Sequence, residues 1–171
     1  MNFRIKVLKE NNIRIENIRE AVSEMKPLPG AVEMLKSLHG LCPRLIILTD
    51  TFEEYATPMF KQLGDYTAFC HSLKIDDEGF IEKHVLRLTD QKRKAVEALK
   101  GLNFKCIAVG DSFNDISMLK AAEVGILFRP SDNVKKAHPE FPVIVDHKEL
   151  ARVISDVLLH GNVPRTAPLS G

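Results

Sequence analysis

Apolar positions along the chain follow two patterns, one typical of amphipathic helices and one typical of buried strands. The helical spacing of three and four residues occurs twice within residues 2–26, with a break at Glu10–Asn12, and predicts a helical hairpin. After "KPLPG" the same spacing predicts a helix that ends at Gly40. The apolar run "RLIILTD" at 44–50 does not alternate, which is typical of a strand buried on both faces of a parallel sheet.

The rest of the chain continues to alternate strands and helices. A helix is expected at 51–64, with Pro58 tolerated in a first turn or at a kink. Residues 67–88 predict a strand and then a hairpin-like excursion around the turn sequence "DDEG". Further helices are predicted at 91–102, 112–122 and 148–160, and further strands at 106–111, 124–128 and 142–145. This order predicts an α/β fold, a Rossmann-like, mostly parallel sheet with flanking helices.

Composition and charge narrow the classes of partner. The 171 residues are enough for one buried core, and 24 Lys and Arg against 23 Asp and Glu leave a net charge of +1. There is no block rich in Lys and Arg, no apolar run of about 18 residues and no secretory signal pattern. We therefore expect a cytoplasmic protein without nucleic-acid or membrane partners. Cys42, Cys70 and Cys106 are widely spaced, which predicts reduced core thiols.

Polar residues follow two of the predicted strands at their carboxyl ends, where open α/β sheets bind ligands. Asp111 closes the strand "CIAVGD", and Asp115 lies one helical turn further on, so both carboxylates can face one crevice. Two hard oxygen ligands with room for water suit magnesium better than zinc. The alternative is a helix N-terminus capped by Ser112 or Asp111, with Asp115 merely exposed.

Thr49 ends the other buried strand and is followed by Asp50 and Thr51. A hydroxyl group and the backbone amides of the next turn form a corner that can hold a phosphoryl oxygen. The alternative is an ordinary helix start, because "TDTFEE" is also a good capping sequence.

Three cations, Lys92, Arg93 and Lys94, stand at the start of a predicted helix, where the helix dipole disfavours positive charge. A phosphate or a metal-bound carboxylate nearby would compensate for that charge. The alternative is a solvated charge run, which is the commoner reason for such a trio.

In chain order these pieces resemble the haloacid dehalogenase superfamily of phosphotransferases, with a strand ending in Thr or Ser, a helix-start Lys and a strand ending in "GDxxxD". The segments "ILTDTFEEY", "FCHSLKIDDEG", "DQKRKAV", "VGDSFNDISML" and "GILFRP" are similar to the phosphoserine phosphatase and homoserine phosphotransferase branch. The resemblance extends from about residue 2 to residue 158. It implies part of a helical cap at 1–26 and a haloacid dehalogenase-like core at 27–160, and we expect a disordered tail at 161–171.

The resemblance also implies roles for single residues. Mg²⁺ would be the cofactor, with Asp111 as a ligand and Asp115 in or just outside the ligand set. Asn114 would orient the site by hydrogen bonding.

For the phosphoryl group, the resemblance implies that Thr49 binds it, with Asp50 beside it, and that Lys92 neutralises the nucleophile and the phosphate. Arg93 and Lys94 are weaker candidates for this last role, because the register of the helix is uncertain from the sequence.

The same family carries, on its first strand, an Asp that attacks phosphorus and a second Asp two residues on, and no such motif precedes Thr49. In "KIDDEGF" the carboxylates of Asp76 and Asp77 are adjacent instead of alternate, so we expect a turn. The chain is therefore expected to begin inside the cap and to be inactive without the nucleophile. Because the missing strand would lie between those ending at Thr49 and Asp111, we expect instability unless these two pair directly.

The leading hypothesis is a Mg²⁺-dependent hydrolase or phosphotransferase for a small phosphorylated amino acid, and phosphoserine, phosphohomoserine and other small phosphomonoesters all remain open as substrates. The alternative is a non-catalytic module that binds a phosphorylated ligand. An unrelated nucleotide-binding domain is disfavoured, because no glycine-rich phosphate loop is present. The oligomeric state also remains open, with a homodimer among the options.

Overall fold

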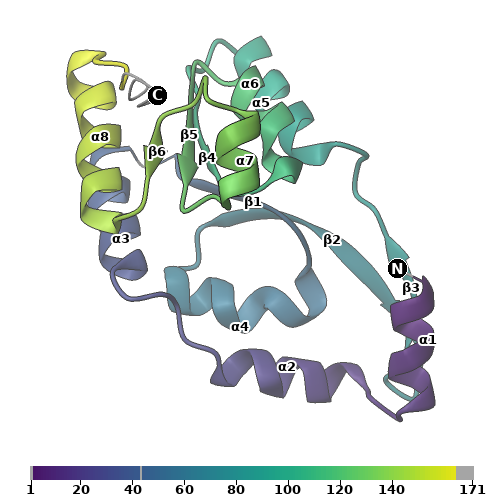
Figure 1. Cartoon of the computed structure of the whole chain (residues 1–171). Coiled ribbons are helices and arrows are strands. Elements are labelled where there is room, and N and C mark those ends of the chain that lie inside the picture. Colours follow the sequence, from purple (N-terminus) through teal and green to yellow (C-terminus); the bar gives the residue numbers. More distant parts are fainter. Residues whose placement is uncertain (1, 43, 165–171) are drawn as a thin grey trace. The chain divides into compact units, whose positions relative to one another are not determined.

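The computed structural model describes residues 2–42 and 44–164, and internal contacts divide the chain into two compact units (Figure 1). The first unit comprises 1–35 and 44–89, and the second comprises 36–43 and 90–171. The boundary between the two units crosses helix α3 (Ala31–Leu41). This helix is the one expected after "KPLPG" and confirms that prediction. The predicted cap, core and tail boundaries stay a prediction, and residues 165–171 of that tail lie outside the described part.

A three-stranded sheet of order β1-β2-β3 forms the centre of the first unit. β1 and β2 run parallel, whereas β2 and β3 run antiparallel. Its elements are α1 (Asn2–Glu10), α2 (Ile15–Glu24), β1 (Ile46–Phe52), α4 (Glu53–Leu63), β2 (Thr67–Ile75) and β3 (Ile81–Val85). β1 is half-buried along most of its length, so the expectation of burial on both faces is wrong for the strand as a whole.

The turn between β2 and β3 confirms the prediction for "DDEG". Asp76 Oδ1 accepts hydrogen bonds from the backbone N–H of Glu78 (3.1 Å) and of Phe80 (2.8 Å). Gly79 takes a positive φ of 88°, which costs a glycine little. The Asp76 carboxylate therefore shapes a turn, as expected.

The two N-terminal helices exist as predicted, but their pairing as a hairpin is wrong. α1 packs against β3, and α2 packs against α4 (Figure 1). At the start of α2, Ile15 is buried and its backbone N–H donates to the Gly79 carbonyl at 2.9 Å. On α1, Phe3 keeps 76% of its surface exposed. α2 is therefore anchored on the turn between β2 and β3 and not on α1, so the two helices do not form the predicted hairpin.

Pro58 lies inside α4 and not in its first turn, so the first-turn option is wrong. A proline in a helix removes the N–H that would bond the carbonyl four residues earlier. Here that carbonyl belongs to Glu54, and Arg19 Nε on α2 donates to it at 2.5 Å. The Glu54 carbonyl has no helical donor, because Pro58 lacks an N–H. Its hydrogen bond from Arg19 thus links α4 to α2.

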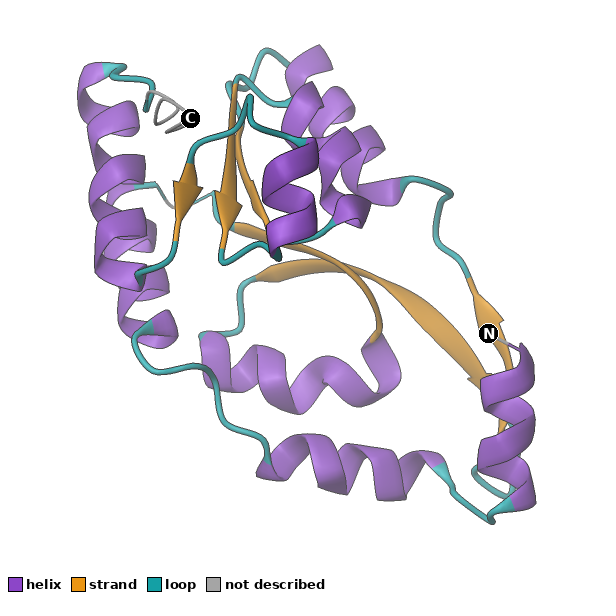
Figure 2. Ribbon diagram, viewed as in Figure 1, coloured by secondary structure: helices purple, strands orange, loops and turns teal. Residues whose placement is uncertain are grey.

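The second unit contains a parallel sheet with strands in the order β4-β5-β6 (Figure 2). The described strands thus form two sheets rich in parallel pairs, where the sequence predicts one. The strands of the second unit are β4 (Ile107–Gly110), β5 (Val124–Phe128) and β6 (Val143–Ile144), and its helices are α5 (Gln91–Gly101), α6 (Ile116–Ala121), α7 (Asp132–Ala137) and α8 (His147–His160). A 3₁₀ turn, η1 (Phe113–Asp115), precedes α6. The short helix α7 is not predicted from the sequence.

Gly125 explains how closely α6 approaches this sheet. A Cβ atom at position 125 would lie 2.7 Å from the Leu119 carbonyl oxygen and 2.8 Å from Cε1 of Phe141. Only a residue without a side chain allows α6 to pack directly on β5. This contact fixes the path of the chain from the carboxyl end of β4 into α6.

The strand that contains Thr49, β1, pairs with β2, and the strand before Asp111, β4, pairs with β5. The predicted instability of the isolated chain, which depended on how these two strands pair, stays a prediction. Within residues 2–42 and 44–164, none of the helices has the length and apolar character needed to cross a bilayer. Cys42, Cys70 and Cys106 are thiols without disulfides, as expected, but they are half-buried instead of deep in the core.

Candidate active site

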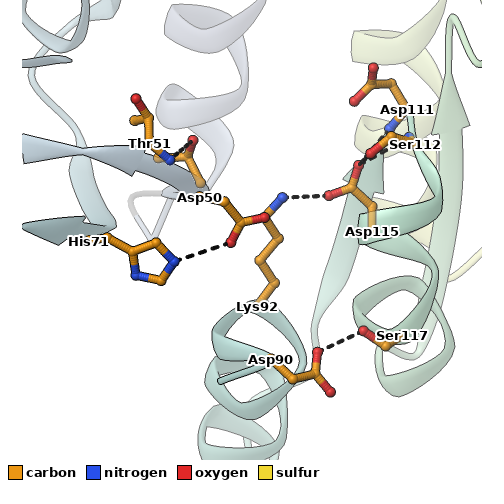
Figure 3. A network of polar contacts seen from close by, with 10 residues as sticks. Asp50, Thr51, His71, Asp90, Lys92, Asp111, Ser112, Asp115 and Ser117 are labelled. Atoms are coloured by element: carbon orange, nitrogen blue, oxygen red, sulfur yellow. Dashed lines mark hydrogen bonds and ion pairs between the residues drawn. The ribbon is translucent and has the colours of Figure 1, made fainter. Parts of the chain in front are cut away.

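Asp115 is the most densely hydrogen-bonded carboxylate at the carboxyl end of β4. Its Oδ2 accepts from the backbone N–H of Asp111 (3.0 Å), and from the backbone N–H (3.1 Å) and hydroxyl (3.0 Å) of Ser112. Its Oδ1 accepts from Lys92 Nζ at 2.9 Å (Figure 3). Asp115 is only 6% exposed, so this chain supplies the donors that replace water around the carboxylate.

Opposing influences act on the charge of Asp115. Burial raises the pKa of this carboxyl group, but the hydrogen bonds from Lys92, the Asp111 amide and Ser112, with the Lys92 charge, lower it by more. The net pKa lies below the usual range for an aspartate, so the group is ionised at neutral pH. A buried, ionised carboxylate beside a buried ammonium group is typical of a functional site, although structural ion pairs also have this character.

The helix-capping alternative is correct in part. Ser112 is the N-cap of the turn that leads into α6, as the alternative proposed, and Asp115 forms a capping box with it. The capping carboxylate is Asp115 and not Asp111, and it is buried instead of exposed.

Gly110 makes room for this arrangement. A Cβ atom at position 110 would lie 2.7 Å from Cγ and 2.9 Å from Oδ2 of Asp115. The "GD" that ends the strand therefore combines a glycine that admits the Asp115 side chain with an aspartate whose amide holds it.

Lys92 lies in the first turn of α5 and extends to Asp115, with 13% of its side chain exposed against 8% for the aspartate. A negative group that compensates for a cation at this helix start is thus confirmed. Arg93 instead binds Asp90 and Glu97, on or next to its own helix. Lys94 is exposed. Of the three cations, the geometry brings only Lys92 to Asp115.

The predicted Mg²⁺ ligands, Asp111 and Asp115, differ in their exposure to solvent. Asp111 is exposed, and Figure 3 shows its carboxylate turned away from Asp115. Asn114 is exposed as well. Within the described part of the chain, no three His, Cys, Asp or Glu side chains are grouped to hold a metal ion. The donors present thus fit Mg²⁺ only in part, with Asp111 as an accessible hard oxygen ligand, and the metal assignment stays a prediction.

In the first unit, β1 continues through Thr49 to Phe52, so the expectation that the strand ends at Thr49 is wrong. Its register with β2 shifts between Leu48 and Phe52, which indicates an irregular strand end. The backbone N–H of Thr51 donates to Thr49 Oγ1 at 3.3 Å. The structure therefore places Thr49 and Asp50 together at this irregular end, and α4 begins directly after it.

His71 on β2 is a neighbour of Asp50 that the sequence did not reveal. It is buried, and its Nδ1 accepts from the backbone N–H of Arg87 at 3.2 Å. In the neutral imidazole this assigns the proton to Nε2, which lies 3.7 Å from Asp50 Oδ1 (Figure 3). A lone histidine in an apolar strand is an ordinary core residue by pattern, so no signal in the sequence marked it.

Comparison with known proteins identifies relatives of this chain. The model of the haloacid dehalogenase-like hydrolase family matches residues 3–123. "Phosphoserine phosphatase ThrH" of Pseudomonas aeruginosa is 40% identical over 152 residues, which are 89% of this chain and 74% of that protein. A phosphoserine phosphatase of Pseudomonas syringae pv. tomato is also 40% identical over 152 residues, with 64% of its own length covered. The chain thus covers less than two thirds of the second relative.

Solved structures confirm the predicted fold. One described as a phospho-aspartyl intermediate analogue of phosphoserine phosphatase superposes with a TM-score of 0.67 at 25% identity, covering 81% of this chain and 69% of that one. A phosphoserine phosphatase from T. onnurineus gives a TM-score of 0.64 at 24% identity, covering 84% and 66%. The α/β fold, with flanking helices and parallel strands, is therefore that of the predicted superfamily.

Proposed function

Because the chain belongs to the haloacid dehalogenase-like hydrolase family, we propose that it is a Mg²⁺-dependent phosphatase for a small phosphorylated amino acid. The observation that carries the proposal is the Lys92–Asp115 pair, a largely buried ammonium group held at 2.9 Å by a carboxylate beside a parallel strand end. The two relatives at 40% identity, both named phosphoserine phosphatase, support phosphoserine as the substrate. That substrate would place the reaction in serine biosynthesis, in the cytoplasm, and phosphohomoserine is the second substrate to test.

In this proposal the chain's own residues bind and orient the phosphoryl group. In the second unit, the Lys92 ammonium group neutralises the charge of the phosphoryl group. In the first unit, the Thr49 hydroxyl and the amides after it are proposed donors to phosphoryl oxygens. Asp115 keeps Lys92 in place, because an ionised carboxylate restricts a flexible lysine stem. Asp50 adjoins Thr49 on β1.

Asp111 would hold Mg²⁺, and Asn114 would orient the groups around it. A bound Mg²⁺ would withdraw charge from the phosphoryl oxygens.

Hydrolysis in this family passes through an attack on phosphorus by a carboxylate. The sequence contains no aspartate before Asp50, so we propose that the 171 residues bind the phosphorylated ligand but hydrolyse it poorly. These residues support binding, whereas the chemical step needs an aspartate nucleophile of a kind that residues 1–49 do not contain.

The test is a phosphate-release assay with phosphoserine and phosphohomoserine, with and without Mg²⁺. The 171-residue chain is compared with a form fused at its N-terminus to a first strand that carries an Asp-x-Asp motif, and with Asp111→Asn in the fused form. We expect activity only in the fused form with Mg²⁺, and its loss in Asp111→Asn. Equal activity of the two forms would refute the nucleophile argument, and no phosphoserine hydrolysis by either would refute the proposed function.

A further inference from the structure

Asp90, the residue before α5, does not use its side chain to cap the first backbone amides of that helix. An aspartate at this position commonly accepts hydrogen bonds from the first amides of the helix, but the Asp90 side chain makes none of these capping bonds. Its Oδ1 instead accepts from the Ser117 hydroxyl on α6 at 2.8 Å (Figure 3). Its Oδ2 is bound by Arg93. The side chain therefore connects two helices.

The backbone of Asp90 is also unusual. Its φ of 53° and ψ of 44° lie in the left-handed region, where a residue other than glycine is disfavoured. Such a conformation persists where the surroundings hold it in place. Arg93, which is itself paired with Glu97 at 2.5 Å, and Ser117 supply contacts that do so.

The connection runs beside the Lys92–Asp115 pair. Lys92 follows Asp90 by two residues, and Ser117 follows Asp115 by two residues. The contacts Asp90–Ser117 and Lys92–Asp115 are thus two neighbouring ties between the same two segments, at 2.8 Å and 2.9 Å. α5 packs along α6, and Lys100 donates to the Ala121 carbonyl further along the pair. At the start of α5, two ties restrict rotation and shift more than one tie through a flexible lysine does.

We propose that Asp90 and Ser117 are positioning residues for Lys92, whose ammonium group they keep at Asp115 by fixing the start of α5 against α6. The role of Lys92 in phosphate binding rests on the proposed function. The placement of Lys92 by Asp90 and Ser117 does not. The hydrogen bond from Arg93, followed by that from Ser117, lowers the pKa of Asp90, so the acceptor is charged at neutral pH.

The test uses the full chain and the variants Ser117→Ala and Ser117→Thr. The side-chain ammonium signal of Lys92, identified by its absence in Lys92→Met, is followed by ¹H–¹⁵N NMR, and the affinity for inorganic phosphate is measured by calorimetry. We expect Ser117→Ala to broaden the Lys92 signal and to weaken phosphate binding about three- to tenfold, the loss that one hydrogen bond typically causes. Ser117→Thr, which keeps the hydroxyl, should keep both the Lys92 signal and the phosphate affinity at the wild-type level.

Ser155→Ala is the matched control. Its hydroxyl donates to the Ala151 carbonyl within α8 at 2.7 Å, so the variant removes a helix serine of the same kind outside the site. It should leave the Lys92 signal and the phosphate affinity unchanged. A purely structural role of Ser117 would lower the melting temperature without moving the Lys92 signal, and that result would overturn the proposal.

The outcomes separate the two claims. A broadened Lys92 signal with unchanged phosphate affinity supports the positioning role and refutes the phosphate role of Lys92. A Ser117→Ala protein with both readouts at the wild-type level overturns the inference.

If Ser117→Ala does not fold, Asp90→Gly replaces it, because glycine adopts the left-handed backbone at little cost and removes the acceptor of the Ser117 hydrogen bond. The Lys92 signal should then broaden. A folded Asp90→Gly protein with a wild-type Lys92 signal would overturn the inference.

Discussion

Gly110→Ala is the substitution that most directly challenges the packing at the end of β4. The added Cβ would lie 2.7 Å from Cγ and 2.9 Å from Oδ2 of Asp115. Both distances are well below van der Waals contact, so the aspartate must move or the turn must open. Because Asp115 Oδ2 accepts three hydrogen bonds and Oδ1 accepts one from Lys92, a shift weakens all four together.

The expected magnitude follows from these contacts. Overpacking by one methyl group costs about 1–3 kcal/mol in a well-packed site. Each hydrogen bond to a charged group contributes about 1.5–3 kcal/mol, and a displaced carboxylate recovers part of this from water. We therefore expect Gly110→Ala to lower the free energy of unfolding by about 2–4 kcal/mol, a large share of the stability of a small domain.

Urea unfolding, followed by circular dichroism, measures this change. Gly101→Ala is the matched control in the same unit, because a Cβ at position 101, the last residue of α5, meets no atom within 4 Å. The control should be neutral or stabilising by up to about 1 kcal/mol. A Gly110→Ala protein as stable as the Gly101→Ala protein would refute the close approach of Asp115 to the backbone.

Three further predictions concern the same contacts and their surroundings. The Asp115 carboxyl has a lowered pKa in the folded state, so it stabilises the fold above its unfolded pKa of about 3.9 and loses this contribution as the pH falls through its folded pKa. Urea titrations across that acidic range should show a shallower loss of stability for Asp115→Asn, and identical slopes would contradict this. Arg19→Ala should destabilise the wild type by about 1 kcal/mol but destabilise a Pro58→Ala background less, because a restored N–H can satisfy the same carbonyl; a double-mutant cycle without coupling would contradict this. Asp76→Ala should lower the melting temperature, whereas Asp77→Ala on the exposed side of the turn should not; equal effects would argue against the turn role of Asp76.

The sequence predicted most strands because each is a short apolar run bounded by turn residues. It failed where the outcome depends on contacts between distant segments. The helical hairpin is wrong, because Ile15 finds its backbone partner in the turn at Gly79 and not in α1. The helix α7 was missed because six residues are too few to show a period.

Site prediction had a similar limit. The helix-start argument pointed to Lys92, Arg93 and Lys94 together, and the family resemblance favoured Lys92. The anion beside Lys92 proved to be Asp115. His71 and Ser117 carry no local signal, since each is an ordinary residue in a strand or a helix. Their roles depend on neighbours 21 and 27 positions away in the chain, at Asp50 and Asp90.

Lys92 is the residue through which we propose that this chain binds a phosphorylated amino acid. Calorimetric titration of phosphoserine in the presence of Mg²⁺ tests this proposal in the wild type, in Lys92→Met and in Lys120→Met, whose lysine is exposed on α6 and pairs with Glu140 at 3.6 Å. We expect binding by the wild type and Lys120→Met, and at least tenfold weaker binding by Lys92→Met. Equal binding by all three proteins, or none by the wild type, would contradict the proposal.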